Sequence, residues 1–186
     1  MVDIQNTGAV ALFEARGWLD EGEYTPEGLS ALSELLDPLP TIWGTTPKGN
    51  QGRWGPVFIS LMSKVVPASI ELVIVRENKV LLTHRTDTFF TGWHTPGSYF
   101  DPSDTLQSAA DRCAEKELGC EVKVERYLNS CLQTKMENKR FADLPNLVLC
   151  HPITEPRSGE WFSEMPDTIL AHHRKYWPYI EAVLSA

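Results

Sequence analysis

The sequence lacks several features that would place it in a common class of protein. No apolar run reaches the roughly 18 residues that a membrane-spanning helix needs. The first segment, MVDIQNTGAVALFEARGW, carries the acidic Asp3 and no basic start before an apolar stretch, so we expect no secretory signal. Internal repeats and low-complexity segments are also missing. These absences favour a globular protein of the cytoplasm.

Paired cysteines and a basic balance are missing as well. The four cysteines form no CxxC pair, which disfavours a zinc site and is typical of free thiols in a reducing compartment. The net charge is −8, whereas a general nucleic-acid binder would present a basic face. An anionic small molecule can still bind such a protein, but it would need a local basic pocket. We therefore expect no nucleic acid and no membrane among its partners.

With 186 residues and 42% apolar content, the chain is long enough for one globular domain plus an extension. We predict a helical extension and loop over 1–60 and the main domain over 61–186. Residues 1–38 read as helical. Within them, Thr25 is the expected N-cap and Pro26 the first helical residue, and Asp37-Pro38 should end the helix.

The segment 39–56, LPTIWGTTPKGNQGRWGP, is glycine-rich and is predicted to be a loop. It contains Trp43, Trp54, Lys48 and Arg53. Two indoles and two cations on one loop can stack on a base and hold phosphate, which makes Arg53 a candidate substrate-binding residue. The alternative is a linker whose tryptophans anchor it to the domain.

The main domain begins with two β-branched segments, 68–78 and 79–85, which are predicted to form a hairpin around Glu77-Asn78. Residues 121–136 alternate and predict one or two strands, and 146–155 predicts a strand covered on both faces. Residues 165–177 predict a closing helix, with Pro178 as a kink or restart. Strands around a central helix and a terminal helix indicate a sheet sandwiched between helices.

The central helix is predicted between an N-cap at Asp104, with Gln107 completing a capping box, and a stop at Gly119. At 100° per residue its apolar face is expected to contain Leu106, Ala110, Cys113 and Ala114. Glu117 lies in the middle of that face. A carboxylate there is costly unless it is paired or binds metal, although a frayed last turn would let it reach water.

The stretch HTPGSYFDPSDTLQSAADRCAEKELGC, residues 94–120, resembles the signature of the Nudix hydrolases. Registered on Gly119, Asp104 matches the first glutamate of that signature, Arg112 its arginine and Glu117 its last glutamate. The preceding GWHTPG is similar to the family's lead-in. Three further matched positions differ in residue type from the signature: Ser98 replaces a glycine, and Cys113 and Lys116 replace two metal-binding glutamates.

The resemblance implies an α+β fold, a Nudix-like α/β/α sandwich with a mixed sheet, preceded by the N-terminal helical extension. The reduced motif is nearest to that of the GDP-mannose mannosyl hydrolases. That branch implies a single Mg²⁺, with Mn²⁺ as an alternative, held by Glu117, the carbonyl of Gly97 and an oxygen donor at Glu155. Pro156 stands where the branch has its catalytic histidine, and Tyr99 where it has a phosphate-contacting arginine.

Several other residues are candidates for the chemistry of this site. Arg85 matches the family's substrate-side arginine, Lys116 can bind phosphate as a point charge, and His84 or His94 can serve as a base. Trp93 and Tyr99, with neighbouring phenylalanines, offer stacking surface. His172 and His173 on the terminal helix are expected to form a solvated basic face. The candidate catalytic residues are therefore Glu117, Arg85 and His94.

Two functions fit this sequence. The first is a Mg²⁺-dependent hydrolase of a nucleoside diphosphate linked to another group, such as a sugar. The alternative is a catalytically inactive Nudix-fold protein that binds a nucleotide or a protein partner. The resemblance also leaves a homodimer open.

Overall fold

The computed structural model describes residues 14–17, 19–20, 23–36, 62, 64–87 and 89–185. The chain divides into two compact units, Met1–Gly52 and Arg53–Ala186. The boundary predicted at residue 60 stays a prediction, and the loop that carries Arg53 lies outside the described residues. None of the helices in these ranges is long and apolar enough to cross a membrane.

Among the described residues of the first unit, a short antiparallel strand pair precedes a helix. The pair is β1 (Leu19–Asp20) and β2 (Glu23–Tyr24), and the helix is α2 (Pro26–Leu36). The Thr25 hydroxyl accepts a hydrogen bond from the Gly28 amide at 3.1 Å, which confirms the predicted cap. The expectation of helix throughout 1–38 is wrong at the two strands. Gly17 adopts the left-handed conformation (φ 68°) and ends a helical turn just before them.

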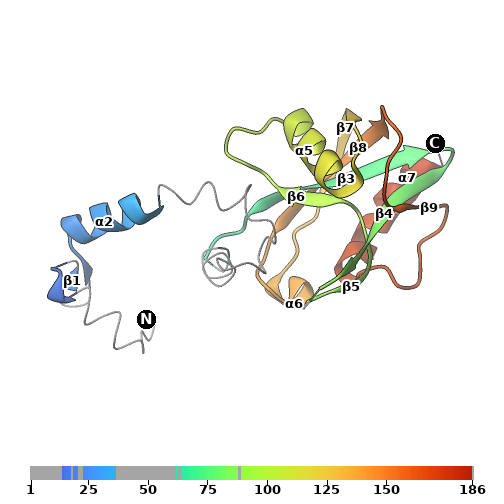
Figure 1. Ribbon diagram of the computed structural model, residues 1–186. Coiled ribbons are helices and arrows are strands. Elements are labelled where there is room, and N and C mark those ends of the chain that lie inside the picture. The colour runs from blue at the N-terminus through green and yellow to red at the C-terminus, as the bar shows by residue number, and fades with distance from the viewer. Residues whose placement is uncertain are drawn as a thin grey trace. The chain divides into compact units, whose positions relative to one another are not determined.

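The second unit is built on a seven-stranded mixed sheet (Figure 1). Its central path runs β5-β4-β3-β8-β7, with β6 paired to β3 and β9 paired to β4. Strands β3 and β8 are parallel, and the other pairs are antiparallel. The strands are β3 (Ala68–Arg76), β4 (Lys79–Thr86), β5 (Thr91–His94), β6 (Gly97–Tyr99), β7 (Val122–Ser130), β8 (Leu144–Pro152) and β9 (Glu160–Phe162).

The predicted hairpin is confirmed. Glu77 and Asn78 both have positive φ, 50° and 56°, as a two-residue turn that matches the strand twist requires. The segment 121–136 gives one strand, β7, and then the short helix α6 (Lys135–Asn138) instead of a second strand. Thr134 and Glu137 form a capping box at its start, a local signal that outweighs the alternating pattern.

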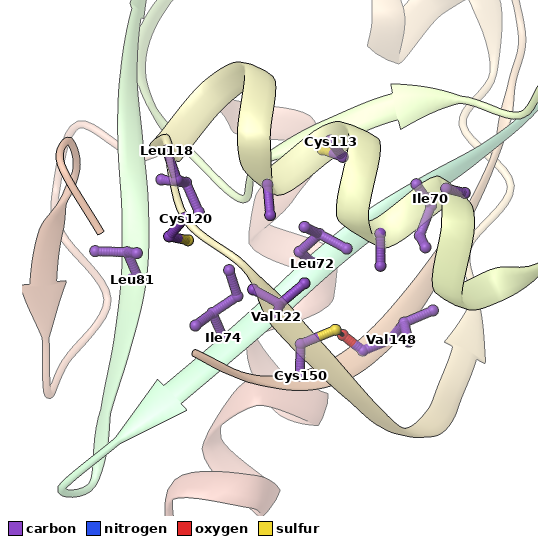
Figure 2. Packing of buried hydrophobic residues seen from close by; sticks show 13 residues of the cluster. Ile70, Leu72, Ile74, Leu81, Cys113, Leu118, Cys120, Val122, Val148 and Cys150 are labelled. Carbon is purple, nitrogen blue, oxygen red and sulfur yellow. Dashed lines mark hydrogen bonds between the residues drawn. The ribbon is translucent and has the colours of Figure 1, made fainter. Parts of the chain in front are cut away.

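Helices cover both faces of the sheet, as the sandwich predicts. Alternate residues of β3 point to opposite layers: Ile70, Leu72 and Ile74 pack under α5 (Leu106–Leu118), as Figure 2 shows. Val73 points to the other layer, formed by η2 (Ala171–Tyr176) and α7 (Trp177–Leu184). Because it is buried on both faces, β3 reads as a nearly continuous apolar run.

The helix α5 begins one residue later than predicted. Its N-cap is Thr105, in a capping box with Ser108, while Gly119 ends it in the left-handed conformation (φ 61°). The buried face consists of Ala109, Ala110, Cys113, Ala114 and Leu118. Leu106, predicted for that face, is 40% exposed at the first turn.

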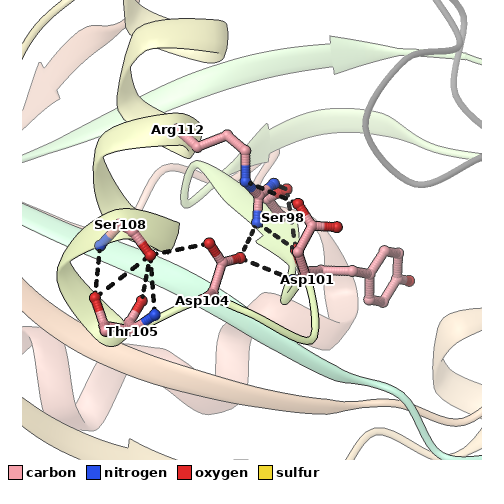
Figure 3. Close-up of polar contacts among 7 residues, drawn as sticks. Ser98, Asp101, Asp104, Thr105, Ser108 and Arg112 are labelled. Carbon is pink, nitrogen blue, oxygen red and sulfur yellow. Dashed lines mark hydrogen bonds and ion pairs between the residues drawn. The ribbon is translucent and has the colours of Figure 1, made fainter. Parts of the chain in front are cut away.

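Arg112 fastens α5 to the loop that follows β6 (Figure 3). Its guanidinium donates to the Ser98 hydroxyl and the Tyr99 carbonyl, both at 3.0 Å, and forms ion pairs with Asp104 and with Asp101. Burial opposes ionisation of Asp104, but hydrogen bonds from the Asp101 amide, Arg112 and Ser108 outweigh it and lower its pKa. Asp104 is therefore the partner of Arg112 and not the N-cap that the sequence predicts.

The C-terminal segment is a 3₁₀ helix followed by an α-helix. Pro178 lies in the first turn of α7, which confirms it as a restart point. The solvated basic face predicted for His172 and His173 is wrong, because the two side chains are only 8% and 5% exposed. At three residues per turn, His173 and Tyr176 lie on one face, and that face packs inward.

We expect Arg112→Met to lower the free energy of unfolding by about 2–3 kcal/mol, because it leaves the buried Asp104 carboxylate without its cation. Urea denaturation followed by circular dichroism measures the change. The matched control is Arg126→Met on β7, whose side chain is 57% exposed and pairs only with Glu125; its effect should stay within about 0.5 kcal/mol. Equal losses for the two variants would contradict this role for Arg112.

Candidate active site

Glu117 is held inward at the end of α5, beside the start of β6. Its carboxylate accepts a hydrogen bond from the backbone N–H of Gly97. Burial raises its pKa to about 7, while the Gly97 bond and the charges of Lys116 and Arg85 act in the opposite direction. The last turn is not frayed, since Gly119 caps it and the Glu117 carbonyl accepts from the Ser158 hydroxyl at 2.6 Å. The inward orientation expected from the helical face is therefore observed.

A second buried carboxylate, which sequence reasoning missed, lies against the same glycine. Glu71 pairs with Gly97 across β3 and β6 and is 9% exposed. A Cβ added at Gly97 would lie 2.5 Å from Oε1 of Glu71, so this carboxylate fills the space of the missing side chain. Burial raises its pKa well above the usual range, and the charges of Glu117 and Asp143 add to that effect.

Glu71 is held by a chain of polar side chains. The Thr95 hydroxyl donates to Oε2 of Glu71 and lies 3.1 Å from Nδ1 of His173. Because that hydroxyl has one proton and gives it to Glu71, Nδ1 of His173 is the donor to Thr95. Burial lowers the pKa of His173 well below its usual range, so the ring is neutral. Glu71 is thus oriented by neutral partners and, among the described residues, has no ion pair within hydrogen-bonding distance.

His94 lies in the same region, but both ring nitrogens are occupied. Nδ1 is 2.7 Å from the Thr95 carbonyl and must donate to it, which leaves Nε2 to accept from the Thr83 hydroxyl at 3.1 Å. Burial lowers its pKa to about 4. His94 is therefore neutral and a weak base in this arrangement. Its catalytic role stays a prediction.

Arg85 is a predicted site residue that lies within electrostatic range of Glu117. Its charge acts to lower the pKa of both Glu117 and Glu71. The Nε atom donates to Asp87, which also accepts from the amides of Phe89 and Phe90. This arrangement fixes the guanidinium at the end of β4.

The remaining predicted residues divide by position. Lys116 is exposed on α5, next to Glu117. Tyr99 is half-buried in β6, and burial raises its pKa. Trp93 is half-buried and makes edge contacts with the rings of Phe162 and His84, and its role in stacking stays a prediction.

Glu155 is not brought to this site. Its exposed carboxylate forms a bidentate ion pair with Arg76, at 2.6 and 3.0 Å. Arg76 lies five residues beyond Glu71 in β3, which corresponds to about 16 Å along the strand. The metal-ligand role that the branch resemblance implies for Glu155 therefore receives no support from its position.

The signal for Glu71 was present in the sequence. It is the only acidic residue in the run ASIELVIV, which otherwise predicts a strand buried on both faces. A carboxylate at such a position needs a partner or a ligand. Its proximity to Glu117 depends on the pairing of β3 with β6, which the local pattern does not contain.

The carboxylate pair suits a hard divalent cation in part. Two carboxylates and a backbone segment supply oxygen donors, and Mg²⁺ needs one or two carboxylates when it keeps its waters and binds substrate phosphates. Within the described ranges, however, no group of three or more histidine, cysteine, aspartate or glutamate side chains could hold a metal ion. The arrangement fits an ion shared with a ligand and not a closed protein site.

These features define an α/β/α-sandwich domain with an acidic pair beside the end of its central helix. Residues 67–185 match the family model of the NUDIX domain, which is more than half of the chain. The chain therefore belongs to the Nudix family, and the predicted family and fold are confirmed. No curated protein matches it significantly.

Solved structures show the same fold at low sequence identity. A MutT Nudix hydrolase from Burkholderia pseudomallei is 23% identical, with a TM-score of 0.53 over 64% of this chain and 98% of that one. A MutT protein from Methanosarcina mazei Go1 is 12% identical, with a TM-score of 0.53 over 65% and 96%. A UDP-X diphosphatase is 15% identical, with a TM-score of 0.55 over 96% and 91%.

Gly97→Ala should destabilise the protein by about 1–3 kcal/mol, because its methyl group would collide with the buried Glu71 carboxylate. The Glu71→Ala background removes the collision, so the same change should cost much less there. Thermal unfolding of the four proteins of this cycle measures the coupling. Additive effects would show that the two residues do not share this space.

The pH dependence of stability reports on Glu117. Its folded pKa of about 7 lies above its usual value, so the protonated form is favoured by folding, and this stabilisation is lost as pH rises through 7. Without metal, Glu117→Gln should therefore unfold at a higher temperature than wild type at pH 8.5 and at nearly the same temperature at pH 5. The difference at pH 8.5 should be on the order of 1–3 kcal/mol. A variant less stable than wild type at pH 8.5 would contradict the burial of this charge.

Proposed function

We propose that this protein is a divalent-metal-dependent hydrolase of a nucleoside diphosphate linked to another group, with a reduced site centred on Glu117. The single observation that carries the proposal is that two carboxylates, the half-buried Glu117 and the buried Glu71, both lie against Gly97. Buried like charges without a counter-ion are costly, so a site that keeps them implies a cation when it works.

The residues of the chain would divide the work as follows. Glu117 would hold the Mg²⁺ or Mn²⁺ ion together with Glu71, which lies against Gly97. Lys116 and Arg85 add positive charge near Glu117. The bound ion would supply neutralisation of phosphate charge and an activated water. Arg85, anchored through Nε on Asp87, keeps its terminal amino groups for the phosphates. Arg112 keeps the Gly97–Tyr99 strand and α5 in register, so it is a positioning residue.

The substrate class follows from two lines of support. The site offers carboxylates for a metal and an arginine for phosphate, which suits a diphosphate. The UDP-X diphosphatase resembles this chain over 96% of its length, including the N-terminal unit. The finer assignment to the GDP-mannose mannosyl branch has weaker support, because Glu155 pairs with Arg76 and no comparison favours that branch.

The rival function is a catalytically inactive binder of a nucleotide or a protein partner. It is favoured by the incomplete ligand set, since the described part of the chain offers no cluster of three metal-binding side chains. The two functions differ in turnover. A binder would show affinity for nucleotides but no released product.

The test is a screen of nucleoside diphosphate derivatives, nucleotide sugars among them, with Mg²⁺ or Mn²⁺, read as released nucleotide or phosphate. We expect turnover that requires the metal and falls at least about 100-fold in Glu117→Gln. Glu71→Gln should also lose activity. Glu155→Gln, which removes an exposed carboxylate paired with Arg76 at the far end of β3, is the matched control and should keep wild-type activity.

Metal binding separates the outcomes further. Mg²⁺ should raise the unfolding temperature of the wild type at pH 8 more than at pH 6, because the proton on Glu117 competes with the ion below its pKa of about 7. Glu117→Gln should lose that shift. Binding of nucleotides without turnover across the whole screen would favour the binder.

A further inference from the structure

Two arginines contact one buried aromatic ring, Phe90. The central guanidinium carbon of Arg85 lies 5.2 Å from the centroid of the Phe90 ring, and that of Arg140 lies 5.1 Å from the same centroid. Phe90 is only 6% exposed. The face of an aromatic ring attracts cations, so Phe90 helps to hold both guanidiniums in place.

Each arginine is anchored in a way that leaves most of its donors available. Arg85 donates through Nε to Asp87, and Arg140 donates through Nε to the Asn138 amide oxygen at 3.0 Å. Asn138 itself is 1% exposed, so this anchor is rigid. Among the residues that the structure describes, the terminal amino groups of both guanidiniums have no hydrogen-bond partner, and Arg140 has no ion pair. A guanidinium in this state presents a planar fork of donors suited to phosphate.

The carboxylate of Asp143, on which the charge of Arg140 acts, does not fully compensate the positive charge of Arg140. Asp143 is 5% exposed, and its Oδ1 has no hydrogen-bond partner among the described residues. Burial raises its pKa to about 6, although Asn138 and the charge of Arg140 act against that rise. Part of the positive charge at Arg140 is therefore left for a ligand.

Arg140 also faces the candidate site. Its guanidinium carbon lies 5.2 Å from the Phe141 ring, and that ring lies 6.1 Å from the Tyr99 ring. Tyr99 closes the three-residue strand that Gly97 opens. The charges of Arg140, Arg85 and Glu71 all act on the pKa of Tyr99, so all three lie within electrostatic range of this side chain.

We propose that Arg140 is the second phosphate-binding cation of this site, and that Arg85 and Arg140 together form a subsite for a diphosphate group. Two separate guanidinium forks around Phe90 match an anion with two neighbouring phosphates better than a single phosphate. This inference rests on the proposed function for the nature of the ligand and does not depend on turnover. Such a subsite would favour substrates that contain two linked phosphates over those that contain one.

The test uses the full chain and inorganic pyrophosphate, titrated by calorimetry at low salt with a metal chelator present. We expect wild type to bind pyrophosphate more tightly than inorganic phosphate. Arg140→Ala and Arg85→Ala should each weaken pyrophosphate binding about tenfold or more. Arg140→Lys keeps the charge but loses the fork, so it should lose less. Arg126→Ala, an exposed arginine on β7, is the matched control and should bind as wild type.

The outcomes separate this inference from the proposed function. Pyrophosphate affinity that depends on both arginines, without hydrolysis of any nucleotide, would support the subsite and overturn the hydrolase. Hydrolysis with unchanged pyrophosphate affinity and unchanged KM in Arg140→Ala would support the hydrolase and overturn the subsite. Absence of pyrophosphate binding by the wild type would also overturn the subsite. The folding of each variant is checked by thermal unfolding, and Arg140→Lys tests the fork should Arg140→Ala prove unstable.

Discussion

The approach of two carboxylates, those of Glu71 and Glu117, to Gly97 organises this site. Gly97 has no Cβ, so the carboxylate of Glu71 can occupy the space beside its backbone, and the amide of the same residue donates to Glu117. One carboxylate from a central strand and one from a helix end thereby contact the same residue of β6. Both are harder to ionise there than in water, because burial disfavours the charged form.

The surrounding fold supplies the rigidity that such a pair needs. Arg112 joins the helix that carries Glu117 to the strand that carries Gly97, using two partners in β6 and two in the loop that follows it. Thr95 and the neutral His173 hold Glu71 from the other layer of the sandwich. Elements of both layers of the sandwich therefore hold the two carboxylates beside the central strand β3. Under the proposed function, the stability lost by burying them would be the cost of a preorganised site.

The family signature is reduced in this chain, and the structure shows what stands in the altered places. Cys113 lies on the buried face of α5, where a glutamate would be costly. Lys116 is exposed beside Glu117. The carboxylate that accompanies Glu117 comes from β3 instead of the helix. Positive charge is supplied on the opposite side by Arg85 and Arg140 around Phe90. We infer a site that relies on arginine to balance phosphate charge more than a three-glutamate helix would.

Local signals determined the elements: the Glu77-Asn78 hairpin, the helix stop at Gly119, the restart at Pro178 and the inward face of Glu117 all follow from short-range geometry. The family and its sandwich fold could be predicted because residues 94–120 keep the spacing of the Nudix signature. Only the tertiary structure decided which groups meet. The pairing of β3 with β6 brings Glu71 to Gly97, the 3₁₀ helix turns His173 inward, and Arg76 forms an ion pair with Glu155. These contacts join residues far apart in the chain, and the period of a helix or strand carries no information about its neighbour.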